Sequence, residues 1–99
     1  MATTLDKLMI VNNFLAVGAG VYHGFCRAQG IEIPSESFEA ATLYGPALLM
    51  AGFASLKAIK GEYERNPGPI GGSIIGFLHG GIVTAAGFGL GYMVGSIII

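Results

Sequence analysis

The stretch from Ile70 to Ile99 reads IGGSIIGFLHGGIVTAAGFGLGYMVGSIII, and it decides the fold. It contains no Asp, Glu, Lys or Arg, and it exceeds the roughly 20 apolar residues that a membrane-spanning helix needs. Nine of its residues are glycine, and each would disfavour an isolated helix in water by roughly 1 kcal/mol relative to alanine. In lipid, an unpaired backbone group costs more than that, and glycine lets a neighbouring helix approach closely. The stretch therefore predicts a tightly packed membrane-spanning helix.

Small residues recur on two faces of this predicted helix. The first glycine row consists of Gly72, Gly76, Gly80, Gly87, Gly91 and Gly95, with Thr84 between its two halves. The second small-residue row consists of Gly71, Gly81, Ala85 and Gly89. Small residues four apart are typical of close helix packing in membranes. A helix with two such faces needs neighbouring helices on two sides, and a chain of 99 residues does not easily supply both. This predicts assembly with other copies or other subunits. The alternative is that glycine is merely frequent, as in many membrane helices.

The composition is that of a membrane protein with one domain, residues 1–99. Hydrophobic residues make up 53% of the chain and charged residues only 11%, against about 25% charged in a typical soluble domain. The net charge of −1 gives no overall attraction for nucleic acid, so any such role has to depend on a local cluster. Cys26 is the only cysteine, which excludes an internal disulfide and predicts a small core residue.

The first predicted helix covers residues 5–27 and has an uncharged centre from Leu8 to Cys26. Such a centre is also typical of a signal peptide, but the adjacent asparagines and the thin basic lead favour a retained helix. Asn12, Asn13 and His23 interrupt the apolar run. Their side chains are expected either to bond to another helix or to lie near the ends of the helix at the lipid interface.

The connection 27–37 is predicted to end the first helix at Gly30 and to begin the second at Ser35, a favourable N-cap. The second helix is expected to cover residues 36–60, with a kink at Pro46. The third is expected to cover residues 68–99. The predicted fold class is therefore all-α: three hydrophobic helices, of which the last two form a helical hairpin that assembles into a helical filament.

The turn GEYERNPGP at 61–69 lies in the more basic of the two connections. With the residues just before it, it holds Lys57, Lys60 and Arg65, three of the five basic residues, and two glutamates offset part of this charge. The first connection is acidic. Because Lys and Arg favour the cytoplasmic side, the turn and the N-terminus are predicted to be cytoplasmic, with the acidic connection and the C-terminus outside.

No pattern in the sequence predicts catalysis, a metal site or a cofactor. His23 and His79 lie on different predicted helices without a third ligand. The uncharged runs contain no carboxylate, which argues against a proton-carrying rotor subunit, because that class needs an acidic residue at mid-membrane. We therefore expect a protein that is not an enzyme.

The second half, Ala40–Ile99, resembles the major pilins of conjugation and type IV secretion-type pili, including archaeal DNA-import pili. The resemblance lies in the hydrophobic helical hairpin, the short turn Lys57–Arg65 and the glycine-rich helix Ile70–Ile99. It implies a subunit that leaves the membrane and assembles into a tube, often with bound phospholipid, whose turn faces the lumen. Lys57, Lys60 and Arg65 would then line that lumen.

The resemblance also implies partners and a location. The partners would be other copies of the chain, membrane lipid, secretion-machine proteins and DNA as transiting cargo. The chain would reside in the cell membrane before assembly and in an extracellular filament afterwards. The alternatives are a small accessory or pore-forming subunit of a membrane complex and a viral membrane coat protein.

Overall fold

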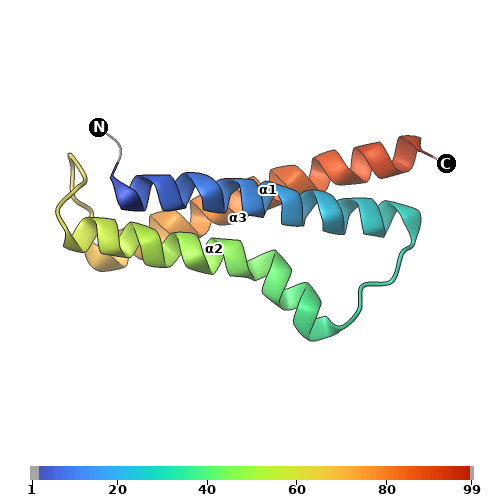
Figure 1. Cartoon of the computed structure of the whole chain (residues 1–99), viewed down its shortest axis with the longest axis horizontal. Coiled ribbons are helices and arrows are strands. Elements are labelled where there is room, and N and C mark those ends of the chain that lie inside the picture. Colours follow the sequence, from blue (N-terminus) through green and yellow to red (C-terminus); the bar gives the residue numbers. More distant parts are fainter. Residues whose placement is uncertain (1–2, 99) are drawn as a thin grey trace.

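The computed structural model describes residues 3–98. It consists of three helices, α1 (Thr4–Gln29), α2 (Glu36–Ile59) and α3 (Gly68–Ile97), and no strand occurs in this part of the chain (Figure 1). Each helix is long and apolar enough to cross a membrane. The prediction of an all-helical protein with three hydrophobic helices is therefore confirmed, and its last residue, Ile99, lies outside the described part.

Local hydrogen bonds fix the ends of α1 and the beginning of α2. Thr3 and Asp6 form a capping box at the start of α1, in which each side chain accepts from the other residue's backbone N–H at 3.1 Å. Gly30 ends α1 in the left-handed conformation with φ 67°, which glycine adopts without strain. Ser35 caps α2 by accepting a hydrogen bond from the N–H of Phe38 at 3.0 Å. The predicted stop at Gly30 and cap at Ser35 are both correct.

The turn between α2 and α3 is held by Asn66. Its Nδ2 donates to the carbonyl oxygen of Ala58 in α2 at 2.7 Å, and its Oδ1 accepts from the N–H of Gly68 at 2.9 Å. Gly61 and Gly68 adopt positive φ angles at the two ends of this turn. One side chain thus ties the end of α2 to the beginning of α3, which makes a tight reversal between antiparallel helices.

The three helices lie lengthwise in an elongated body of 49 × 27 × 18 Å (Figure 1). Helix α3 runs obliquely, so that its first half packs against α2 and its second half against α1. Helix α2 bends, and its first turns spread outward while Phe38 and Thr42 keep contact with Tyr22 and His23 of α1. Pro46 lies inside α2 and supplies the cause of the predicted kink, because proline lacks the N–H that the preceding turn would bond.

The first half of the first glycine row packs against α2. A Cβ atom added to Gly80 would lie 2.7 Å from the Cα of Ala47, and one added to Gly76 would overlap the carbonyl oxygen of Met50. These contacts involve backbone atoms, which cannot move aside as a flexible side chain can. The helices therefore approach as closely as glycine allows.

The second half of the row packs against α1. A Cβ atom on Gly87 would lie 2.5 Å from the carbonyl oxygen of Val17, and one on Gly91 would overlap the carbonyl oxygen of Val21. The row changes partner near Thr84, whose hydroxyl donates to the carbonyl oxygen of Gly80 within the same helix at 2.8 Å.

All six glycines of the first row are buried within one copy of the chain. We expected that neighbours outside the chain would be needed to pack against both small-residue rows. For the first row this is wrong, because α1 and α2 of the same chain already pack against it. The second row has room for such a neighbour, because a Cβ atom on Gly81 or Gly89 would meet nothing within 4 Å and Ala85 is exposed.

Candidate functional site

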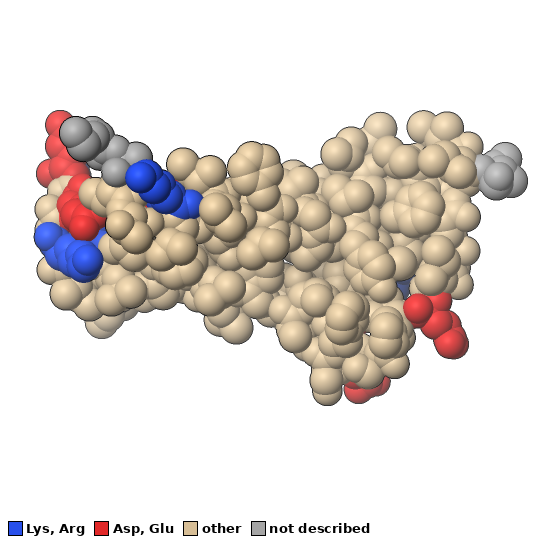
Figure 2. Space-filling model, viewed as in Figure 1, with Lys and Arg blue, Asp and Glu red and all other residues tan. Residues whose placement is uncertain are grey.

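Charged residues gather at the two ends of the molecule and leave an uncharged band between them (Figure 2). One end carries the α2–α3 turn and the start of α1, and the other carries the α1–α2 connection. Many large apolar side chains on the band are exposed, among them Phe14 at 75% and Ile82 at 69%. Soluble monomers rarely expose so much apolar surface, so this band is suited to contact lipid or other protein chains.

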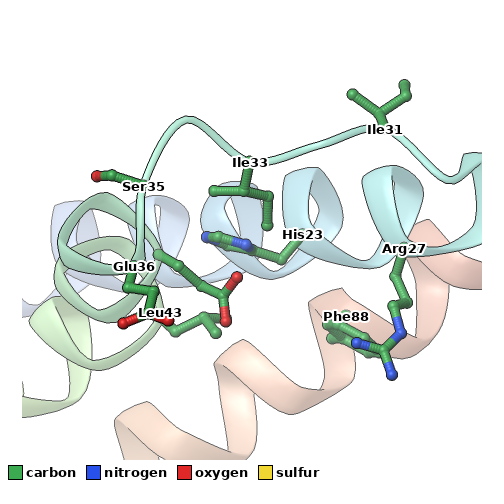
Figure 3. Close-up of a pocket in the computed structure, with 9 residues that line it drawn as sticks. His23, Arg27, Ile31, Ile33, Ser35, Glu36, Leu43 and Phe88 are labelled. Carbon is green, nitrogen blue, oxygen red and sulfur yellow. The ribbon is translucent and has the colours of Figure 1, made fainter.

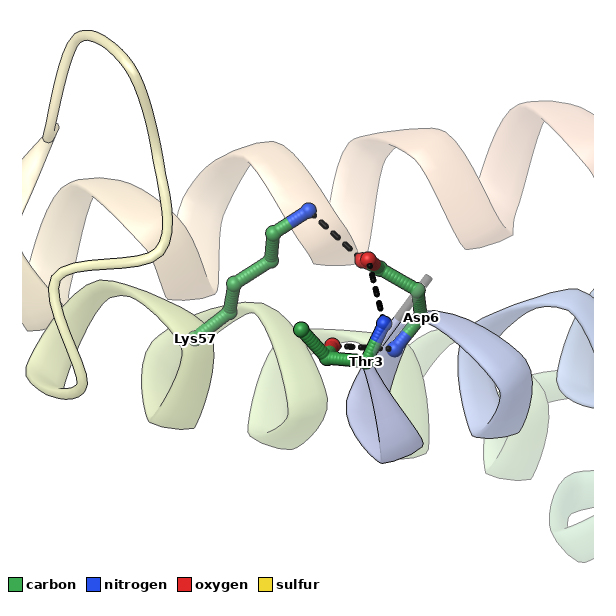
Figure 4. Close-up of polar contacts among 3 residues, drawn as sticks. All are labelled: Thr3, Asp6 and Lys57. Atoms are coloured by element: carbon green, nitrogen blue, oxygen red, sulfur yellow. Dashed lines mark hydrogen bonds and ion pairs between the residues drawn. The ribbon is translucent and has the colours of Figure 1, made fainter. Parts of the chain in front are cut away.

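The end that carries the α2–α3 turn and the start of α1 is called the basic end, because it holds Lys7, Lys57, Lys60 and Arg65. Lys57 at this end is held by an ion pair. Its Nζ lies 2.7 Å from Oδ1 of Asp6, and its side chain and that of Asp6 are 19% and 28% exposed (Figure 4). The same Nζ lies 4.8 Å from the ring centroid of Tyr63, within the range of a cation–π interaction. The charge of Lys57 is therefore largely balanced within the chain.

Lys60 and Arg65 are more accessible than Lys57. Lys60 caps the end of α2, Arg65 lies in the turn, and both are exposed. Among residues 3–98, neither forms an ion pair. Lys7, at the start of α1, is exposed at the same end. The three predicted turn residues thus lie at one end, but the accessible positive charge comes from Lys60, Arg65 and Lys7.

The sequence interpretation missed the pairing of Asp6 with Lys57. A signal for it was present, because the predicted topology places the beginning of the first helix and the end of the second on one side of the membrane. A carboxylate and an ammonium group at the same level on adjacent helices are natural partners.

Polar side chains join α1 and α2 across the uncharged band. Asn12 is 2% exposed and donates from Nδ2 to the carbonyl oxygen of Pro46 at 2.8 Å. His23 is also 2% exposed, and its Nε2 bonds to Oγ1 of Thr42. Of the two alternatives for these side chains, the structure shows interhelical hydrogen bonds for Asn12 and His23. Asn13 is partly buried, and its Oδ1 has no partner within the described part of the chain.

The remaining candidates for chemistry do not converge. His79 is exposed on α3, whereas His23 is enclosed between α1 and α2. No group of three or more His, Cys, Asp or Glu side chains suited to a metal ion occurs within residues 3–98. Cys26 is free and buried, as expected of a small core residue.

Comparison with protein-family models, curated protein sequences and solved structures gives no significant match. Three features of the chain therefore bear on its function. They are an uncharged apolar band, a basic end, and a second small-residue row on α3 where an added Cβ atom on Gly81 or Gly89 meets no neighbour.

Proposed function

We propose that the chain is the structural subunit, or major pilin, of a tubular, lipid-associated pilus that transfers or takes up DNA. The observation that carries the proposal is the second small-residue row. Gly81 and Gly89 face open space on a helix whose other glycine row is already filled. Small residues gain little from lipid contact but allow close approach of another helix, which favours a second copy as the neighbour.

The exposed apolar band supports assembly from a membrane. Bulky side chains along it can contact lipid while the subunit is stored in the cell membrane and can contact neighbouring subunits in an extracellular filament. Phospholipid could stay between subunits in such a filament. Secretion-machine proteins would be needed to extract the subunits, because each of the three helices is apolar enough to remain in the bilayer.

The basic end supports a role in conducting DNA. Lys60 and Arg65 are exposed, and Glu64 beside them is also exposed. A wall of alternating charge attracts phosphate only weakly, which suits a moving strand better than strong contacts repeated in every subunit. Lys57 contributes less, because Asp6 already balances it.

Negative-stain microscopy of sheared cell surfaces, followed by mass spectrometry of the filaments, tests the proposal. Filaments built from this chain are the expected result. Their absence from cells that express the chain would instead favour an accessory or pore-forming membrane subunit. That second candidate is supported by α1, which packs along α3 and completes a three-helix unit within one copy.

Charge reversal tests the role of DNA separately. In cells that make filaments, Lys60→Glu with Arg65→Glu is expected to reduce DNA transfer at least about tenfold while filaments persist, because the wall becomes repulsive to phosphate. The matched control, Lys60→Arg with Arg65→Lys, keeps every charge and should transfer DNA normally. Normal DNA transfer by the Glu variant would contradict the role in conducting DNA, while the role as a filament subunit would still stand.

A further inference from the structure

A pocket of about 470 Å³ opens at the end of the molecule that carries the α1–α2 connection (Figure 3). Its charged lining comes from Arg27 of α1 and from Glu36 and Glu39 at the start of α2. Its apolar lining includes Leu43 of α2 and Phe88 of α3. All three helices therefore contribute to one pocket, and Ile31 and Ile33 of the α1–α2 connection add further apolar lining.

The opposite charges around the pocket form no direct ion pair with each other. Lys57 and Asp6 form the one ion pair within residues 3–98, so Arg27 makes none with Glu36 or Glu39. Figure 3 shows Arg27 on the Phe88 side of the pocket and Glu36 on the opposite side. The pocket thus presents a site for an anion and a site for a cation, separated by open space.

His23 also lines the pocket, but its unpaired ring nitrogen is enclosed by protein. The hydroxyl of Thr42 donates to the carbonyl oxygen of Phe38 at 2.8 Å, so its oxygen accepts a hydrogen bond from Nε2 of His23. The neutral ring then carries its proton on Nε2, and Nδ1 is an acceptor. Nδ1 is buried and has no partner among the described residues, although His23 lines the pocket. Because this nitrogen has almost no accessible surface, a molecule in the pocket would not reach it, and the charged groups that can meet such a molecule are those of Arg27, Glu36 and Glu39.

We propose that this pocket binds a zwitterionic amphiphile. Its ammonium group would contact the two glutamates, its anionic group would pair with Arg27, and its apolar part would lie along Leu43 and Phe88. Phosphoethanolamine carries this combination of charges, either as the headgroup of a lipid or as a free molecule. The proposal goes beyond the pilus function and needs no filament, because the pocket is complete within one copy of the chain.

Native mass spectrometry of the full chain in a maltoside detergent tests the site with three probes: dioleoylphosphatidylethanolamine, dioleoylphosphatidylglycerol and free phosphoethanolamine. The ethanolamine lipid is expected to bind about tenfold more tightly than the glycerol lipid, because only the former supplies the ammonium group. Arg27→Gln should weaken both lipids. Competition by free phosphoethanolamine at similar concentration would identify a soluble ligand as the source, and failure to compete would identify a lipid.

The carboxylates give the decisive comparison. Glu36→Gln with Glu39→Gln should remove the preference for the ethanolamine lipid without weakening the glycerol lipid. The matched control is Glu32→Gln, which removes an acid of the same connection from outside the pocket lining and should change neither affinity. Circular dichroism checks that the double variant stays helical, and Glu39→Gln alone should give an intermediate loss of preference if it does not. Equal affinity of the unchanged chain for the two lipids, or an unchanged preference in both Gln variants, would overturn the proposal.

Discussion

Asn12 of α1 donates a hydrogen bond to the carbonyl oxygen of Pro46, the residue at which α2 is expected to kink. The bond measures 2.8 Å and joins residues 34 positions apart in the sequence. Helix α2 is bent rather than straight (Figure 1). The contact therefore fixes α1 to α2 beside Pro46, and the hydrogen bond between His23 and Thr42 joins the two helices again nearer the start of α2.

Loss of this hydrogen bond is expected to destabilise the folded chain. Asn12→Ala should lower the free energy of unfolding in detergent micelles by about 1–2 kcal/mol, because it removes a buried interhelical bond and leaves a small cavity. Asn13→Ala is the matched control, since Asn13 is less buried and makes no hydrogen bond within the described residues. Thermal or denaturant unfolding measures both variants, and equal losses would show that the bond to Pro46 contributes nothing.

The two small-residue rows of α3 should respond in opposite ways to an added methyl group. Gly91→Ala is expected to destabilise the chain by about 1–3 kcal/mol, because the new Cβ overlaps the backbone of α1 at Val21. Gly89→Ala meets nothing within 4 Å and should be neutral or stabilising by up to about 1 kcal/mol, since alanine favours the helix. Unfolding of the purified variants checks this. A neutral Gly91→Ala would mean that α1 and α3 pack less closely than described.

The helices could be predicted from the sequence because their signals are local. The uncharged runs predicted the three helices. Gly30 predicted the end of α1, and Ser35 predicted the start of α2. The first glycine row was visible as a face, but its partners were not. A row of small residues indicates close packing without saying which helix approaches, and here the partner changes from α2 to α1 near Thr84.

The ion pair and the pocket could not be predicted from the sequence, because each is formed by residues that are far apart along the chain. Asp6 and Lys57 are 51 positions apart, and only the assembled bundle brings them together. The pocket beside Arg27 likewise needs the divergence of α2, whose extent cannot be derived from the presence of Pro46 alone. Sequence reasoning therefore identified charged ends but could not tell which charges are neutralised.

The Asp6–Lys57 pair should contribute modestly to stability and more to the arrangement of the basic end. Lys57→Met is expected to cost no more than about 1 kcal/mol, because the pair is partly exposed. Lys57→Glu should cost more, since it places two carboxylates together. The exchanged pair, Asp6→Lys with Lys57→Glu, also removes the capping box of α1, so the double variant should lose less stability than the sum of the two single variants without reaching the unchanged chain. A double-mutant cycle from unfolding measurements tests this, and strictly additive losses would show that the two side chains do not interact.

The second small-residue row separates subunit assembly from folding within one chain. Gly81→Leu and Gly89→Leu each add bulk where a Cβ atom meets nothing in the chain, so the helical content and unfolding temperature in detergent should stay close to those of the unchanged protein. Under the pilus proposal, the same bulk would separate neighbouring subunits and filaments should disappear from sheared cell surfaces.

Ile82→Leu is the control for that experiment, because it changes an exposed α3 side chain without changing its volume. It should fold and assemble normally. Filaments of normal appearance from both Gly→Leu variants would show that the second row faces lipid and would remove the main support for assembly through α3. Loss of filaments together with loss of folding would instead place the row inside the fold. Loss of filaments in well-folded variants is the outcome that assigns the row to contacts between subunits.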